Sequence, residues 1–161
     1  PILYALDAQL TLASTNGRRT LNIRDFLTGP GRKDLRPDEI LSEISFSWGE
    51  FNRFYYRKLG PRKANAIAKV SFFGAASIFD EQVRDIRLAF GAVGPTVVRS
   101  TAGEALLTDV STATGRTRVP QVMDHYAALL SPIDDVRSTA DYRRTVALEL
   151  LQDFLRKELV Q

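Results

Sequence analysis

The end of the chain constrains the fold most, because an apolar stripe with helical spacing there follows a long region of strand-like sequence. The stripe consists of Tyr142, Val146, Leu150 and Phe154, extended by Leu151, Leu155 and Leu159. Such spacing predicts a helix with one apolar face, and Ser138 or Thr139 can cap its start. Strands that precede helices in this way predict an α+β fold, with helices packed on one face of an antiparallel sheet.

The region before this helix alternates apolar and polar residues in the manner of strands. Strands are predicted at residues 8–13, 19–23, 39–46, 51–58, 67–79 and 83–93. The Asn16-Gly17 pair predicts a hairpin turn between the first two. Helices are predicted at residues 25–27, 101–110 and 119–130. Pro120 would lie near the first turn of the last of these, where proline is tolerated.

Composition narrows the kinds of site that the chain can hold. The 161 residues are 44% hydrophobic and contain no cysteine, which excludes disulfides and thiolate metal ligands. The single histidine, His125, has no serine, cysteine or acid at a helpful spacing, so we expect no catalytic residue and no metal site. No apolar run approaches the ~18 residues of a membrane helix, and no signal peptide opens the chain. A cytoplasmic location without a membrane span is the expectation.

A basic aromatic segment, residues 53–63 (RFYYRKLGPRK), is the most conspicuous local feature in a chain whose net charge is only +3. Cations interleaved with aromatic rings could bind nucleic acid, could bind a flavin nucleotide, or could form a strand with buried rings and solvated charges. No recognised nucleic-acid module accompanies the segment, so we expect no nucleic-acid partner.

Two other motifs have simpler interpretations. Residues 29–33 (GPGRK) lack the spacing of a phosphate-binding loop. Asp134 and Asp135 are adjacent, so their carboxylates do not converge on one point. We expect them to cap the last helix or to pair with Arg137, Arg143 or Arg144.

Several stretches together resemble the FAD-binding (medium) subunit of molybdenum hydroxylases, the xanthine dehydrogenase and CO dehydrogenase family. They are residues 6–14 (LDAQLTLAS), 17–20 (GRRT), 25–32 (DFLTGPGR), 35–41 (LRPDEIL), 56–64 (YRKLGPRKA), 67–71 (IAKVS), 91–99 (GAVGPTVVR), 131–137 (SPIDDVR) and 140–144 (ADYRR). Their order and spacing extend over nearly the whole chain.

The resemblance implies two domains. Residues 1–54 would be the end of a two-subdomain FAD-binding domain, and residues 55–161 a small C-terminal α+β domain like that of the CO dehydrogenase flavoprotein. In the family, electrons pass from a molybdopterin centre in a large subunit through two [2Fe–2S] clusters in a small subunit to FAD. The flavin then reduces NAD or another acceptor. The chain would thus be part of an oxidoreductase that works only with those partner subunits.

The resemblance also implies three cofactor-binding residues. Leu41 matches a position that lines the isoalloxazine pocket, Lys58 matches a lysine close to the flavin ring, and Tyr56 is a third contact. Asn65 stands where some members carry an acid. The family's pyrophosphate loops would precede Pro1, so we expect an internal start, and we expect the chain alone to be inactive and to bind FAD weakly.

A different class of function stays open. The chain could be a non-catalytic interaction module whose basic aromatic edge binds a partner protein or RNA.

Overall fold

The computed structural model describes residues 1–62 and 65–159 and contains two antiparallel sheets there. Lys63 of the basic aromatic segment therefore lies outside the described residues. The first sheet has the order β2-β1-β3, and the second has the order β4-β5-β6-β7 with β8 beside β6. The strands are β1 (Gln9–Ser14), β2 (Gly17–Asn22), β3 (Ile40–Ser45), β4 (Arg53–Leu59), β5 (Val70–Phe79), β6 (Gln82–Gly91), β7 (Val98–Arg99) and β8 (Val110–Ser111). The predicted strands correspond to β1 to β6, whereas the short strands β7 and β8 were not predicted.

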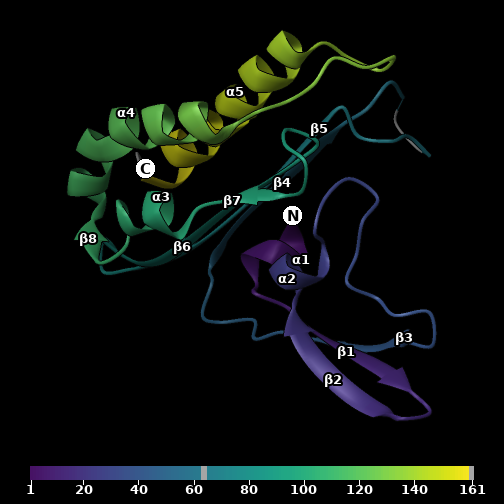
Figure 1. The fold of residues 1–161 in the computed structure, drawn as a ribbon. Helices are drawn as coiled ribbons and strands as arrows, with labels where there is room; N and C mark the ends of the chain where they lie inside the picture. The colour runs from purple at the N-terminus through teal and green to yellow at the C-terminus, as the bar shows by residue number, and fades with distance from the viewer. Residues whose placement is uncertain (63–64, 160–161) are drawn as a thin grey trace.

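The helices divide between the two faces of the second sheet. They are α1 (Ile2–Ala5), α2 (Ile23–Phe26), α3 (Thr101–Ala105), α4 (Thr112–Leu129) and α5 (Ala140–Leu159). The long helices α4 and α5 lie side by side over one face, while the short helices α1 and α2 lie between the two sheets (Figure 1). The expected α+β architecture is confirmed.

Each face of the second sheet has its own core. Strand alternation turns Phe72 toward α4 and α5, where it joins Phe154 and Tyr126 in a fully buried cluster. Its neighbour Phe73 points to the opposite face and packs in a second cluster with Tyr4 and the first sheet. The sheet thus separates a helix-covered side from a side that faces α1 and α2.

The buried face of α5 differs from the predicted stripe. Its buried apolar residues are Ala147, Leu151, Phe154, Leu155 and Leu159, whereas Tyr142 is 41% exposed. A spacing of four residues advances by about 40° beyond each helical turn, so Tyr142 lies about 120° around the helix from Phe154. The predicted cap is present, because Thr139 Oγ1 accepts a hydrogen bond from the backbone N–H of Tyr142 at 3.2 Å.

Helix α4 begins earlier than predicted, and α3 ends earlier. Ser111 caps α4 by accepting a hydrogen bond from the Thr114 N–H at 3.1 Å, so Pro120 lies inside the helix and not in its first turn. The first turns of α4 show no apolar stripe, so the sequence pattern did not indicate where this helix begins. Helix α3 stops at Ala105, and Val110 instead belongs to β8, where it pairs with Val83.

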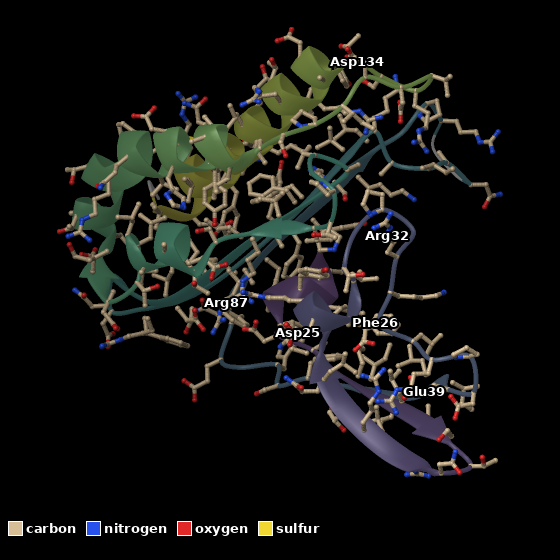
Figure 2. The ribbon with its side chains drawn as sticks, viewed as in Figure 1. Asp25, Phe26, Arg32, Glu39, Arg87 and Asp134 are labelled. Atoms are coloured by element: carbon tan, nitrogen blue, oxygen red, sulfur yellow. The ribbon has the colours of Figure 1, made fainter. Side chains whose placement is uncertain are left out.

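One arginine fixes the long connection between α2 and β3. The Arg19 guanidinium donates to both carboxylate oxygens of Glu39 at 2.7 and 2.9 Å and to the Asp34 carboxylate at 2.7 Å. The Arg36 N–H also donates to Glu39 at 2.8 Å. Figure 2 shows Glu39 beside the first sheet. The hydrogen bonds from Arg19, and then that from Arg36, lower the pKa of Glu39 to about 2.

This network predicts a pH dependence of stability. The folded-state pKa of Glu39 lies below its usual value of 4.5, so its stabilising contribution is present above pH 4.5 and is lost as the pH falls toward 2. Urea unfolding across this range should show a smaller pH dependence for Glu39→Gln than for the natural chain. The control is Glu43→Gln on β3, which should retain the natural dependence. An unchanged dependence in Glu39→Gln would contradict the prediction.

Candidate functional site

An apolar recess lies beside α1 and α2, on the face of the second sheet that is opposite α4 and α5. Its volume is about 280 Å³, and its lining residues are Pro1, Ile2, Leu3, Tyr4, Ile23, Leu27, Tyr56 and Val97. Burial raises the pKa of the Tyr4 phenol, which keeps this ring uncharged. The recess therefore has a largely apolar lining, as small-molecule sites usually do.

Strand β4 supplies one side of the recess through its alternation. Tyr55 points to the helix side, where its hydroxyl donates to Asp153 at 2.7 Å and its ring packs on Phe154. Tyr56 therefore points to the opposite face, opposite Phe73 of β5, and it is 47% exposed. Lys58 shares the face of Tyr56, two residues further along the strand.

Lys58 is connected to a lining residue of the recess, Pro1, only through a row of cross-strand neighbours. Lys58 pairs with Ser71, which in turn pairs with Gly91. A Cβ atom at Gly91 would lie 2.5 Å from Ser71 Oγ and 3.3 Å from Pro1 Cγ. Pro1 therefore lies against the Gly91 end of this row. Two of the three predicted cofactor-binding residues, Tyr56 and Lys58, share one face of β4, and Tyr56 lines the recess.

Leu41 lies elsewhere. It is on β3 of the first sheet, opposite the buried Leu12, and it is 42% exposed. Leu41 is not among the described residues that line the recess.

Most of the recess was missed by sequence reasoning. The four residues of α1 are too few to show a helical period, and Val97 lies far along the chain. Two signals pointed to this face, the basic aromatic segment and the family resemblance, and both did so through Tyr56 and Lys58.

A second recess, of about 290 Å³, lies among the connections at one end of the second sheet. Arg143 is 3% exposed there. Its guanidinium donates to the carbonyls of Lys69 at 2.7 Å and Ala92 at 3.1 Å and to Asp135 at 2.7 Å. Hydrogen bonds from Arg137, with a further one from Arg143, hold the pKa of Asp135 well below its usual range.

The neighbouring Asp134 accepts a hydrogen bond from the Ala140 N–H at the start of α5, and Figure 2 shows it at that end of the molecule. The capping and pairing roles predicted for the two acids are confirmed, except that Arg144 instead donates to the Ala127 carbonyl.

His125 has a partner that its sequence neighbours do not supply. Its Nε2 lies 2.8 Å from Ser100 Oγ. The same hydroxyl accepts from the Gly103 N–H at 3.1 Å and so caps α3. No carboxylate among the described residues is hydrogen-bonded to this ring. Ser100 therefore acts as a helix cap here, and the pair lacks the acid that would orient His125 as a base for a nucleophile.

Within residues 1–62 and 65–159, no helix is both long and apolar enough to span a bilayer. The same residues contain no group of three or more His, Asp or Glu side chains that could hold a metal ion.

Two protein-family models match the chain side by side. The model of the FAD binding domain in molybdopterin dehydrogenase matches residues 1–47. The model of the CO dehydrogenase flavoprotein C-terminal domain matches residues 55–158. The first matched part contributes Ile2, Leu3, Tyr4, Ile23 and Leu27 to the recess. The second matched part contributes Tyr56 and Val97. The recess therefore lies between the two matched parts.

The medium chains of two dehydrogenases are similar to most of the chain. The glyceraldehyde dehydrogenase medium chain of Sulfolobus acidocaldarius is 26% identical over 90% of this chain and 50% of its own length. The carbon monoxide dehydrogenase medium chain of Hydrogenophaga pseudoflava is 28% identical over 92% of this chain and 51% of its own length. The chain thus spans about half the length of these relatives.

Solved structures share the fold. Carbon monoxide dehydrogenase from Hydrogenophaga pseudoflava, in a form that lacks the Mo-pyranopterin moiety of the molybdenum cofactor, aligns with a TM-score of 0.80 and 27% identity over 96% of this chain and 53% of that one. Quinoline 2-oxidoreductase from Pseudomonas putida 86 aligns with a TM-score of 0.79 at 21% identity, over 98% of this chain and 54% of that one.

Proposed function

Because this chain belongs to the CO dehydrogenase flavoprotein C-terminal domain family, we propose that it forms part of the FAD-binding subunit of a molybdenum hydroxylase. In this proposal the subunit relays electrons from iron–sulfur clusters through FAD to an acceptor. One observation carries the proposal: an apolar recess lies between the part that matches a FAD-binding domain and the part that matches the flavoprotein C-terminal domain.

The recess fits one end of a flavin ring. Small-molecule pockets measure about 300–1,000 Å³, so a recess of about 280 Å³ can receive part of a planar ring system but not a whole dinucleotide. Its lining is largely apolar, and Lys58 lies on the same face of β4 as Tyr56, which is one of the lining residues. When bound, FAD would supply the chemistry of accepting and passing on electrons.

The chain's own residues would bind the ring and tune it. The apolar side chains of α1 and α2 exclude water from the ring, and Tyr56 packs against it. The Lys58 ammonium favours negative charge on the ring and so raises its reduction potential. Leu41 is proposed as a further apolar contact, from the side of the first sheet. Asn65, in place of an acid, adds no charge.

We propose that residues 1–54 and 55–161 are separate domains, and that the subunit assembles in the cytoplasm with an iron–sulfur small subunit and a molybdopterin large subunit. NAD or another acceptor would take the electrons. The names of the relatives support this, since they include medium chains of dehydrogenases.

Absorption spectroscopy of the subunit, purified with the polypeptides it assembles with, tests the proposal. A yellow protein with oxidised-flavin bands is expected. A colourless protein that retards an RNA probe in a gel would favour the interaction module instead.

In the same protein, Lys58→Met should lower the flavin reduction potential by about 30 mV, which corresponds to about 1.4 kcal/mol for a two-electron couple. A spectroelectrochemical titration measures this shift. Arg57→Met is the matched control, because Arg57 lies over the Tyr55 ring on the helix face. Equal flavin reduction potentials in the two variants would show that Lys58 does not tune the flavin.

A further inference from the structure

A single carboxylate joins three arginines from three separate elements. Asp7 pairs with Arg24 of α2 at 3.0 Å, with Arg87 of β6 at 2.9 Å and with Arg99 of β7 at 2.8 Å. Asp7 comes soon after α1 and has a φ of 50°, a left-handed conformation that aspartate and asparagine tolerate better than most residues. Figure 2 shows Arg87 on the side of the second sheet near α1 and α2. The Asp7 carboxylate therefore connects the start of the chain to the sheet.

Arg99 is the buried member of this group. Its side chain is 1% exposed. Its Nε and Nη2 donate to the two carboxylate oxygens of Glu104 at 2.7 and 3.0 Å, while its Nη1 donates to the Tyr4 carbonyl at 2.7 Å. The rigid guanidinium fork makes this possible, because it binds one carboxylate with two donors and keeps a third donor for another partner. Arg99 thus ties the end of α1 to the C-terminal part of the chain.

These contacts involve the two segments that also line the recess. Ile2, Leu3 and Tyr4 of α1 form one wall of it, and Val97 lies only two residues before Arg99. Helix α1 has a single turn, with hydrogen bonds from the Ala5 N–H to the Pro1 carbonyl and from the Leu6 N–H to the Ile2 carbonyl. So short a helix has little stability of its own. Its position depends on what holds it to the sheet.

We propose that Asp7 and Arg99 are positioning residues that hold α1 as the wall of the recess. Neither residue lines the recess, and both act through α1. The consequence for flavin binding rests on the proposed function, while the consequence for α1 itself does not.

Asp7→Asn tests the proposal in the assembled protein, because asparagine keeps the shape and the left-handed backbone while it removes the charge. Removing the negative charge weakens all three ion pairs of Asp7, although the amide oxygen still accepts hydrogen bonds. The net weakening should speed FAD release about ten-fold and should alter the visible circular dichroism of the flavin. Asp85→Asn is the matched control: Asp85 also pairs with Arg87, at 2.8 Å, but is not among the partners of Arg99. It should leave both readouts at natural values.

Hydrogen exchange gives a readout that is independent of flavin. The Ala5 and Leu6 amides should exchange faster in Asp7→Asn than in Asp85→Asn. If Asp7→Asn matches Asp85→Asn in FAD release or in amide exchange, the positioning role is wrong. If the natural protein holds no flavin, the proposed function fails, and amide exchange alone then decides whether Asp7 positions α1.

Discussion

Replacing Phe154 by alanine is expected to lower the free energy of unfolding by about 3–5 kcal/mol, the usual cost of emptying a buried aromatic site. Phe154 is fully buried, and its ring centroid lies 5.9 Å from that of Phe72 and 6.0 Å from that of Tyr55. It therefore joins α5 to both β4 and β5. Urea titration of the natural and variant chains measures the change. Tyr142→Ala on the same helix is the control and should cost less than about 1 kcal/mol, because that ring is 41% exposed.

Gly74 supplies an independent check on this result. A Cβ atom at Gly74 would lie 2.9 Å from the Phe154 ring, so Gly74→Ala should cost about 1–3 kcal/mol by overpacking. The same substitution should cost much less in the Phe154→Ala background, where the obstructing ring is gone. Additive costs in the double variant would show that the ring does not occupy the space above Gly74.

Arg143→Met is expected to lower the free energy of unfolding by about 3 kcal/mol. Removing one partner of a buried ion pair typically costs about 3–5 kcal/mol, and the lower end applies because Asp135 keeps its contact with Arg137. The carbonyls of Lys69 and Ala92 also lose a donor. Three connections that meet at this end of the sheet would thus lose their common partner.

Arg137→Met is the matched control, since Arg137 binds the same Asp135 carboxylate but is 42% exposed. An exposed pair of this kind contributes about 0–1 kcal/mol. Thermal and urea unfolding of both variants measure the difference. Equal losses of stability would mean that burial does not set the contribution of Arg143.

The sequence was sufficient for the elements whose patterns are long. The hairpin at Asn16-Gly17, the paired strands β5 and β6, and the helix α5 each extend over enough residues for a period of two or close to four to be visible. It was insufficient for α1, which has one turn, and for the start of α4, where threonine and glycine show no apolar stripe.

The candidate site was only partly predictable for a different reason. Tyr56 and Lys58 were predicted from the family resemblance, and strand alternation alone explains why they share a face. The remaining wall of the recess comes from residues that are distant in sequence, and Asp7 meets Arg99 only because the fold brings the two segments together. Contacts between distant segments leave no periodic signal in a single sequence.

The exposed strand β3 has a practical consequence for anyone who prepares this chain. All six residues of β3 are exposed, including Ile40, Leu41 and Ile44, and no described strand pairs with its outer edge. An apolar strand with a free edge is a template for self-association. We therefore expect concentrated samples of the separate chain to aggregate through β3. Ile40 is 68% exposed. Ile40→Lys would place a charge on this strand and should improve solubility without disturbing the recess.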